Sequence, residues 1–281
     1  MMKKQKLVLI GNGMAGVRTL EELLKLVPNT YDITVFGAEP YGNYNRILLS
    51  PVLAGEMKLD DIMLNDLEWY KTNGINLHAG KKISKIDRAR KTVFADDGTE
   101  VQYDRLVLAT GSTPFMPPIP GMDLPGVLAY RDIADTESMI AATANYKNAV
   151  VIGAGLLGLE AANGLLLRGM NVTVVHLADW IMERQLDKVA ADMLQSSLEA
   201  KGMKFLLGRN TEALVENDEK RVSAIRFKDG MQIAADLVVV AAGIRPNYAL
   251  AESSGLFCGS GRVRGIHVSD TLQTITDPSI Y

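Results

Sequence analysis

The chain has 281 residues, of which 47% are hydrophobic and 22% charged, and its formal net charge is -3. These values are ordinary for a globular protein, and the length allows two domains that each bury a core. The slightly acidic balance does not indicate a nucleic-acid partner, and the longest apolar runs are too short to cross a bilayer. We therefore expect neither nucleic acid nor a membrane as a partner.

Cys258 is the only cysteine, so the chain alone can form no disulfide, no C-x-x-C redox pair and no cysteine-ligated iron–sulfur cluster. The three histidines are scattered without the spacing of a metal site, and we predict no bound metal. The basic N-terminus precedes an apolar run, Leu7–Ile10, that is typical of a first strand and too short for a signal peptide. The expected compartment is the reducing cytoplasm.

The first half of the chain has a β-α-β pattern. The apolar run Leu7–Ile10 leads into a G-x-G-x-x-G turn, a helix-like stretch follows at Leu20–Leu26, and "DITVF" (32–36) is strand-like. The acid-led apolar segment "DRLVLATGS" (104–112) closes this first copy. Uninterrupted runs of Val and Leu favour parallel strands covered on both faces and joined by a right-handed crossover.

The same pattern returns in the second half. "AVVIGAGLLG" (149–158) opens it, Leu159–Leu167 is helix-like, "NVTVV" (171–175) is strand-like, and "ADLVVVAAGIRPN" (235–247) closes it. A duplicated β-α-β pattern of this kind is typical of α/β folds.

The border between the copies is rich in proline. Residues 112–126 hold five of the ten prolines, which excludes a helix and favours a stiff, extended connection. We therefore predict an α/β fold with two Rossmann-like (three-layer ββα) dinucleotide-binding domains, the second inserted in the first. Residues 1–113 and 244–281 would form one domain, and residues 114–243 the other.

Each glycine turn has the residues that dinucleotide binding requires. The first glycine allows the tight bend, the second lets the backbone approach a pyrophosphate, and the third allows close packing of helix on strand. The helix that follows offers unpaired N–H groups and partial positive charge to the phosphates. The alternative is a pair of structural turns in a nucleotide-free protein. The glycines are Gly11, Gly13 and Gly16 in the first turn, and Gly153, Gly155 and Gly158 in the second.

In each copy, the residue after the second strand is expected to lie where a dinucleotide places a ribose. Glu39 follows the strand of the first copy and is expected to bind ribose hydroxyls, or else is a surface charge. His176 holds the matching place in the second copy, where no acid stands and no cation precedes Arg184. It is either a hydrogen-bond partner of the adenosine ribose or a structural histidine. The missing cation favours NADH, and the choice between NADH and NADPH stays open.

Two such turns predict two dinucleotides that exchange electrons, and FAD with NADH (or NADPH) is the natural pair for hydride transfer. With "LVLATGS" and "VVVAAGIRPN" in this layout, the whole chain resembles the pyridine-nucleotide-dependent flavoprotein oxidoreductases. "YNRILLSPVLAGE" (44–56), "IMERQLD" (181–187) and "AGIRPN" look like the N-terminal part of the large subunit of NAD(P)H nitrite reductases, and rubredoxin and ferredoxin reductases have similar motifs. The resemblance implies FAD in the outer domain and NAD(P)H in the inserted one.

The resemblance also implies contacts beyond the glycines. Arg46 of "YNR" and Arg131 match arginines that contact FAD, and each has the alternative of being a surface cation. Ile83 falls where the backbone of the family binds adenine. Related reductases carry a lysine shortly after the "YNR" arginine, where this chain has Pro51. The residues expected to bind a cofactor are Gly11, Asn12, Gly13, Met14, Ala15, Gly16, Glu39, Arg46, Ile83, Ala109, Thr110, Gly111, Arg131, Gly153, Gly155, Leu156, Leu157, Gly158, His176 and Gly243.

Glu160 lies at the start of the second copy's helix, where the helix dipole stabilises a carboxylate and is enough to explain it. The resemblance implies a further role near the junction of nicotinamide and flavin, and Glu160 is the one catalytic residue that we predict. Hydride transfer otherwise requires positioning and exclusion of water. Relatives that pass electrons to a cysteine carry it at the position of residues 40–55, where this chain has none. We therefore expect an acceptor outside the chain.

The last residues, "TITDPSIY", resemble the approach to a final strand, after which the family has a turn that binds FAD. We expect a fragment of a longer reductase that lacks this turn, the dimerisation domain and the iron–sulfur and sirohaem ligands, with reduced FAD affinity. The predicted function is an FAD-dependent NADH oxidoreductase module of nitrate assimilation, which passes electrons to nitrite reduction in the remainder of the same reductase. The alternatives are electron transfer to rubredoxin or ferredoxin, and a nucleotide-sensing flavoprotein without enzymatic activity.

Overall fold

The computed structural model describes residues 4–261 and 264–281. The chain forms two compact units. The first unit consists of Met1–Asn45, Met63–Thr113 and Pro246–Tyr281, and the second consists of Arg46–Ile62 and Pro114–Arg245. Within the described ranges, no helix combines the length and the apolar character needed to span a bilayer.

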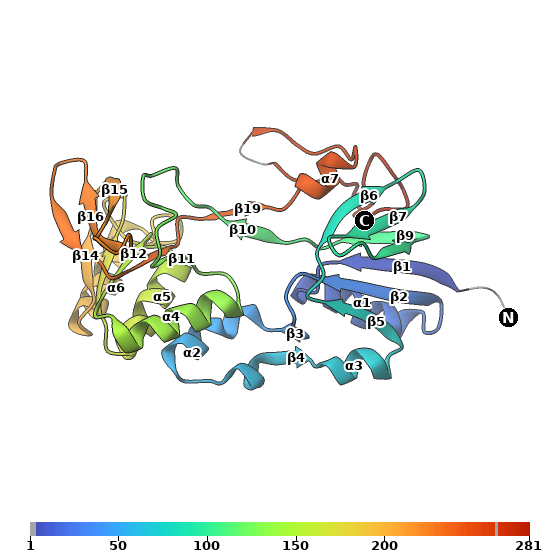
Figure 1. Cartoon of the computed structure of the whole chain (residues 1–281), viewed down its shortest axis with the longest axis horizontal. Coiled ribbons are helices and arrows are strands. Elements are labelled where there is room, and N and C mark those ends of the chain that lie inside the picture. The colour runs from blue at the N-terminus through green and yellow to red at the C-terminus, as the bar shows by residue number, and fades with distance from the viewer. Residues whose placement is uncertain (1–3, 262–263) are drawn as a thin grey trace. The chain divides into compact units, whose positions relative to one another are not determined.

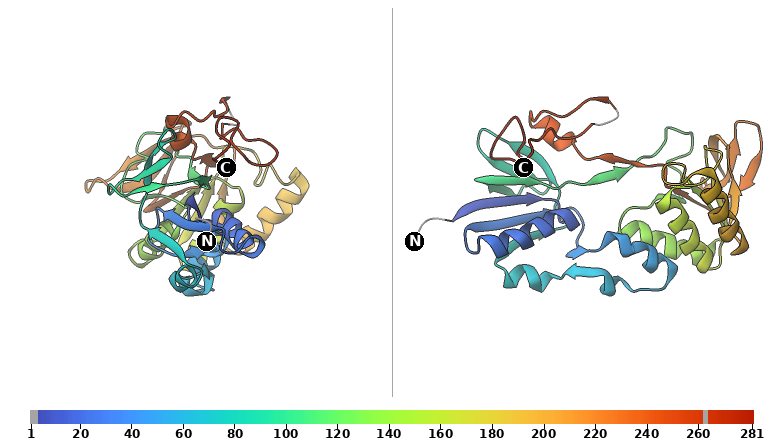
Figure 2. Two further views of the ribbon diagram at one scale, coloured as in Figure 1. Left: turned by 90° about the vertical axis from the view of Figure 1, so that its right-hand side faces the viewer. Right: turned by 180° about the vertical axis from the view of Figure 1, so that it is seen from behind.

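The first unit is built on a parallel sheet. Its strands, in spatial order, are β5 (Ile75–Ala79), β2 (Tyr31–Gly37), β1 (Gln5–Ile10) and β9 (Arg105–Leu108). One face carries the helices α1 (Met14–Leu26) and α3 (Leu67–Thr72). The other face carries the antiparallel strands β6 (Ile83–Asp87), β7 (Thr92–Ala95) and β8 (Glu100–Gln102), as Figures 1 and 2 show.

Strand β1 shows why its sequence is apolar at every position. Successive side chains of a strand point to opposite faces of the sheet. Leu7 and Leu9 therefore pack in the core on the α1 side, while Val8 and Ile10 pack in the core that contains Ile83 of β6. A strand covered on both faces cannot alternate apolar and polar residues.

The second unit repeats this arrangement. Its parallel sheet has the order β14 (Lys204–Leu206), β13 (Asn171–Val175), β12 (Asn148–Ile152), β18 (Leu237–Val240) and β11 (Val127–Ala129). Helix α5 (Leu156–Leu167) packs against β12 and β13, and the antiparallel strands β15 (Thr211–Glu216), β16 (Val222–Phe227) and β17 (Gln232–Ala234) form a core with the opposite face. Helices α4 (Ile133–Asn145) and α6 (Lys188–Ala200) complete the unit.

The two sheets have matching strand orders. The series β14-β13-β12-β18 corresponds to β5-β2-β1-β9, and in both units a glycine turn and a helix follow the central strand. The fifth position is filled by β11 in the second unit and by a parallel bridge from Ile280 to Leu106 in the first. The predicted fold of two Rossmann-like units, the second within the first, is confirmed.

Short elements connect these layers. The first unit also has the antiparallel pair β3 (Asn43–Tyr44) and β4 (Met63–Asn65), and helix α7 (Ala249–Ser253). The second unit has the 3₁₀ helices η1 (Arg46–Leu48) and η2 (Leu59–Ile62) on either side of α2 (Leu49–Ala54). Strands β10 (Ser112–Pro114) and β19 (Ile244–Pro246) pair with each other where the chain passes from one unit to the other.

One segment lies in a different unit from the one expected. Residues 46–62 were expected in the first domain, but they pack with the second unit. The reason is helix α2, which lies beside α4 and α5 (Figure 1). Leu53 of α2 is buried against Gly164 of α5, and the Arg168 guanidinium donates to the carbonyl oxygens of Val52 and Leu53. The Arg168 side chain, which directly follows α5, thus satisfies carbonyl groups in the last turn of α2.

The last residues continue the sheet of the first unit. The backbone of residues 279–281 exchanges hydrogen bonds of 2.8–2.9 Å with β9. Asp277 anchors the preceding turn, because its carboxylate accepts hydrogen bonds from the Ser279 hydroxyl (2.7 Å) and from Arg88 (3.2 Å). Burial alone would raise the pKa of Asp277, but these hydrogen bonds outweigh burial and lower the pKa below its ordinary value.

Candidate functional site

The first glycine turn joins β1 to α1. Gly11 has φ +111°, a conformation that residues with a side chain rarely adopt, and a Cβ atom there would overlap the carbonyl oxygen of Ala109. A Cβ at Gly16 would lie 2.6 Å from the carbonyl oxygen of Gly11. At Gly13, by contrast, a Cβ would meet no described heavy atom within 4 Å. Two glycines are therefore required by the protein itself, whereas the middle one faces open space.

The second turn, between β12 and α5, repeats this geometry. Gly153 has φ +118°, and a Cβ there would overlap the carbonyl oxygen of Ala241. A Cβ at Gly158 would overlap the carbonyl oxygen of Gly153, while one at Gly155 would again meet no described atom within 4 Å. The sequence repeat is thus also a repeat of backbone geometry.

The helices that follow the turns begin without side-chain caps. Among the four helices of 12 or 13 residues, α4 and α6 have the N-cap residues Asp132 and Asp187, whose carboxylates accept hydrogen bonds from backbone N–H groups. Helices α1 and α5 have the N-cap residues Gly13 and Gly155, and no described side chain caps either helix. Their first N–H groups, with the positive end of the helix dipole, are suited to an anion. Together with the open space at both glycines, this fits the pyrophosphate of a dinucleotide.

Apolar residues follow each uncapped start. Met14 and Ala15 are the first residues of α1, and Leu156 and Leu157 are the first residues of α5. The two leucines are 59% and 37% exposed, although they lie beside a well-packed core. Exposed leucines at this position suit a surface that a ligand covers.

Asn12 holds the first turn in place. Its side-chain amide donates to the carbonyl oxygen of Tyr41 (3.1 Å), and its side-chain oxygen accepts from the Tyr70 hydroxyl (2.6 Å). Burial raises the pKa of Tyr70 to about 12, so this hydroxyl keeps its proton at neutral pH. The Asn43 amide also donates to the Asn12 carbonyl oxygen (3.1 Å). We assign Asn12 mainly to shaping the turn.

Glu39 and the segment before Ile83 lie beside the end of β2. The Glu39 carboxylate accepts a hydrogen bond from the Tyr44 hydroxyl (2.6 Å), and its carbonyl oxygen accepts one from the N–H of Gly80 (2.9 Å). The side chain of Ile83 is buried in the core, so only its backbone could face a ligand. The structure thus brings these two predicted residues to the same end of the sheet.

The closing turn of the first copy lies next to the first glycine turn. The N–H of Ala109 donates to the carbonyl oxygen of Ile10 (2.8 Å). Thr110 is linked to Asn247 in both directions: its hydroxyl donates to the Asn247 carbonyl (2.7 Å), and the Asn247 amide donates to the Thr110 carbonyl (2.8 Å). The N–H of Asn247 also donates to Gly111 (2.9 Å). Asn247 was not among the predicted site residues, and its signal was the asparagine that ends "AGIRPN".

His176 follows β13 and lies against the second turn. Its Nδ1 accepts a hydrogen bond from the N–H of Ala154 (3.3 Å), and its Nε2 lies 2.9 Å from Glu183 Oε2. Both ring nitrogens therefore have protein partners, which supports the structural alternative for His176. No acid directly follows β13 in the sequence, but the fold supplies Glu183. Only the return of the chain at Met182, whose N–H donates to the carbonyl oxygen of Ala154 (2.9 Å), brings it there.

Glu160 is part of a hydrogen-bonded chain within the second unit. The Ser50 hydroxyl donates to Glu160 Oε2 (2.6 Å), and the Tyr130 hydroxyl donates to the Ser50 oxygen (3.2 Å). Tyr130 is buried, and burial raises its pKa to about 12. In this chain a serine hydroxyl therefore contacts the glutamate side chain. Ser50 was not predicted, because its partner lies 110 positions away in the chain.

Arg46 and Arg131 both act on Asp135, in different ways. The backbone N–H of Arg131 donates to the Asp135 carboxylate (2.7 Å), and the charge of Arg46 also acts on this carboxylate. Burial, followed by the nearby Asp132, raises the pKa of Asp135, while these contacts oppose the rise. Arg46 was expected in the first domain but belongs to the second unit.

Gly243 follows β18, near the second turn. It has φ +116°, and its carbonyl oxygen accepts a hydrogen bond from the N–H of Phe115 (2.8 Å). A Cβ at Gly243 would meet no described heavy atom within 4 Å. Like Gly155, it leaves backbone open at the carboxyl end of the sheet, where ligands of α/β folds bind.

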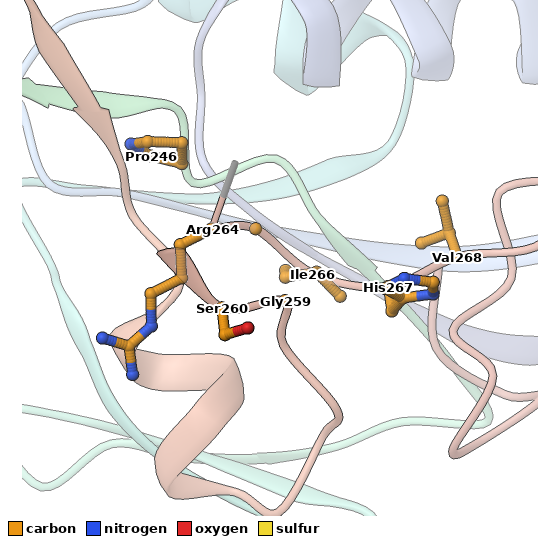
Figure 3. Close-up of a pocket in the computed structure, with 8 residues that line it drawn as sticks. Pro246, Gly259, Ser260, Arg264, Ile266, His267 and Val268 are labelled. Carbon is orange, nitrogen blue, oxygen red and sulfur yellow. The ribbon is translucent and has the colours of Figure 1, made fainter. Parts of the chain in front are cut away.

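A separate pocket of about 760 Å³ lies in the first unit (Figure 3). It is lined by Pro246, Gly259, Ser260, Arg264, Gly265, Ile266, His267 and Val268, and includes none of the predicted site residues. Elsewhere in the described ranges, no group of three or more His, Cys, Asp or Glu side chains is arranged to hold a metal ion.

Comparisons with known proteins agree with this geometry. The family model "Pyridine nucleotide-disulphide oxidoreductase" matches residues 5–281. A nitrite reductase [NAD(P)H] of Bacillus subtilis is 54% identical over 280 residues, which cover 100% of this chain and 34% of that protein. The assimilatory nitrate reductase electron transfer subunit of the same organism is 48% identical over 280 residues, covering 100% of this chain and 35% of that protein. The chain thus spans about a third of the length of these relatives.

Solved structures show the same fold. A NAD-dependent persulfide reductase from A. fulgidus has a TM-score of 0.91 and 32% identity, with 98% of this chain and 52% of that chain covered. A ferredoxin reductase from Rhodopseudomonas palustris has a TM-score of 0.90 and 28% identity, with 99% and 67% covered. The family expected from the sequence is confirmed: this chain belongs to the pyridine nucleotide-disulphide oxidoreductases.

Proposed function

We propose that the first unit binds FAD, that the second binds NADH, and that the chain is the module in which NADH reduces the flavin. The observation that carries the proposal is the duplicated turn: each unit has an uncapped helix start beside a glycine with open space, at Gly13 and Gly155. Bound FAD would supply the hydride-accepting ring, and the nicotinamide the hydride. The expected location is the cytoplasm.

The residues of the chain contribute binding and positioning. In the first unit, the N–H groups at the start of α1 would hold the FAD pyrophosphate, and Glu39 would accept hydrogen bonds from ribose hydroxyls. In the second unit, the start of α5 would hold the NADH pyrophosphate. Ser50 holds the Glu160 carboxylate in one orientation, which suits a polar contact with a bound nicotinamide. No step requires these residues to transfer a proton.

We further propose that the electrons leave the chain for nitrite reduction, through iron–sulfur and sirohaem centres in the remainder of a longer reductase. The support is the similarity over the full chain to a nitrite reductase and to a nitrate reductase electron transfer subunit. A second candidate has the same first step and a small electron-transfer protein as acceptor. Its support is the similarity to ferredoxin reductases.

The test of the first step is to add FAD to the purified chain, remove the excess, and mix the complex with NADH without oxygen in a stopped-flow spectrophotometer. We expect the absorbance of oxidised flavin to disappear in a phase that saturates with NADH. A chain that binds FAD but is not reduced by NADH or NADPH would refute the proposed electron transfer. Once NADH has reduced the flavin, adding ferredoxin, or the full-length reductase with nitrite, tests which acceptor takes the electrons.

Two variants serve as controls for each other. Gly13→Ala should weaken FAD binding and leave NADH binding intact, whereas Gly155→Ala should do the reverse. Both positions have open space and ordinary φ angles, so neither change should disturb the fold. If both variants lost the same ligand, the assignment of one nucleotide to each unit would be wrong.

A further inference from the structure

The end of β13 carries an acid that comes from a distant position in the chain. In dinucleotide-binding folds, an acid after the second strand binds the ribose hydroxyls of the adenosine half. Here His176 occupies the place directly after the strand, and Glu183 follows seven positions later. The two side chains nevertheless meet, with His176 Nε2 and Glu183 Oε2 2.9 Å apart.

The backbone fixes Glu183 beside the glycine turn. Met182 has a left-handed conformation (φ +55°) and its N–H donates to the carbonyl oxygen of Ala154, the residue between the first two glycines of the turn. The side chains of Ile181 and Met182 are buried and anchor this return. Glu183 therefore reaches the carboxyl end of β13 through a fixed turn and not through a long, free side chain.

The histidine orients the carboxylate. Because His176 Nδ1 accepts from the N–H of Ala154, the proton of the neutral ring lies on Nε2 and is donated to Glu183. Burial would raise the pKa of Glu183, but the hydrogen bond from His176, a backbone hydrogen bond and nearby positive charge together outweigh burial, and the pKa falls below the ordinary value. The side chain of Glu183 remains 32% exposed, so an anionic carboxylate faces solvent beside the turn.

We propose that Glu183, positioned by His176, accepts hydrogen bonds from the ribose hydroxyls of the adenosine half of NADH and excludes the 2′-phosphate of NADPH. The inference rests on the proposed role of the second unit. A 2′-phosphate would bring a second anion to this carboxylate. The cations Arg184 and Arg209 lie nearby, and both already act on carboxylates. The charge of Arg184 lowers the pKa of Glu183, and Arg209 is paired with Asp229.

The test is a calorimetric titration of the 281-residue chain with NADH and, separately, with NADPH. We expect the chain to bind NADH at least about tenfold more tightly than NADPH. Glu183→Gln keeps an acceptor for His176 and removes the charge, and should reduce this preference about tenfold or more. Asp192→Asn removes an equal charge from the exposed face of α6 and should leave the preference unchanged.

The role of His176 has its own pair of variants. His176→Ala leaves Glu183 without its hydrogen-bond donor and should weaken NADH binding with little effect on NADPH. In His176→Gln the side-chain amide offers both an acceptor for Ala154 and a donor for Glu183. This variant should therefore retain most of the preference for NADH over NADPH. Thermal unfolding of each variant checks that the fold is kept.

The outcomes separate the inference from the proposed function. If Glu183→Gln leaves the NADH-to-NADPH ratio unchanged, or if Asp192→Asn changes it equally, the assignment of Glu183 is wrong while NADH binding by the second unit stands. If the wild-type chain prefers NADPH, the inference is also wrong. If it binds neither nucleotide, the proposed function of the second unit fails, and the inference fails with it.

Discussion

In the second turn, replacing one glycine by alanine should lower the stability of the fold, and replacing another should weaken NADH binding. At Gly153 an added methyl group meets two obstacles: the backbone has φ +118°, and the Cβ would overlap the carbonyl oxygen of Ala241. Ala241 is itself held at the end of the sheet, because its N–H donates to the carbonyl oxygen of Ile152 (2.8 Å). At Gly155 the backbone has φ -81° and ψ -179°, which any residue adopts, and no described heavy atom lies within 4 Å of a Cβ.

The expected effects on stability differ in size. Gly153→Ala costs about 1–3 kcal/mol for the unfavourable backbone conformation and about 1–3 kcal/mol for overpacking. The sum, roughly 2–6 kcal/mol, lowers the midpoint of thermal unfolding by roughly 4–24 °C for a unit of this size. Gly155→Ala loses about 0.5–1 kcal/mol at the helix start and gains about 0.4–1 kcal/mol because the unfolded chain is less flexible. Its midpoint should therefore lie within about 4 °C of the wild type.

The expected effects on binding are reversed. A methyl group at Gly155 occupies the space that a phosphate needs to reach the N–H groups of α5, so Gly155→Ala should bind NADH at least about tenfold more weakly. Differential scanning calorimetry measures the midpoints, and titration with NADH measures the affinity. The reasoning is refuted if Gly155→Ala unfolds as early as Gly153→Ala, or if it binds NADH as tightly as the wild type.

Three further predictions concern packing and pH. Gly164→Ala places a methyl group 2.7 Å from Cγ of Leu53, so urea titration should show a loss of about 1–3 kcal/mol, and most of that added cost should vanish when Leu53→Ala is already present. Ser50→Ala removes the partner of the buried Tyr130 hydroxyl and should cost about 1–3 kcal/mol; a cost that is just as large when Tyr130→Phe is already present would contradict this. Asp277 has a lowered pKa because its hydrogen bonds outweigh burial, so its stabilising effect is present above the unfolded pKa of about 4 and is lost as the pH falls through the lower folded value. The difference in unfolding free energy between the wild type and Asp277→Asn should therefore shrink on acidification, and a constant difference would count against the assignment.

Features that depend on neighbouring residues could be predicted from the sequence. The apolar runs identified the central strands, because a parallel strand covered on both faces is apolar throughout. The two glycine turns were located to the residue, because a left-handed φ at Gly11 and Gly153 and a close approach at Gly16 and Gly158 leave a glycine signature in the chain itself.

Features that depend on distant partners could not be predicted. Residues 46–62 were expected in the first domain, and tertiary contacts such as the packing of Leu53 on Gly164 and the hydrogen bonds of Arg168 place them in the second unit. Ser50 could not be recognised as the partner of Glu160, because no local pattern links residues of two separate helices.

The amino-acid sequence by itself determined the number of glycine turns, their place after a strand and before a helix, and the family. Each of these follows from residues that lie a few positions apart in the chain. The tertiary structure alone decided which side chains surround those turns. Glu183 shows the physical reason: a left-handed residue at Met182 and its hydrogen bond to Ala154 turn the chain back, and a carboxylate seven positions beyond His176 comes to lie at its ring.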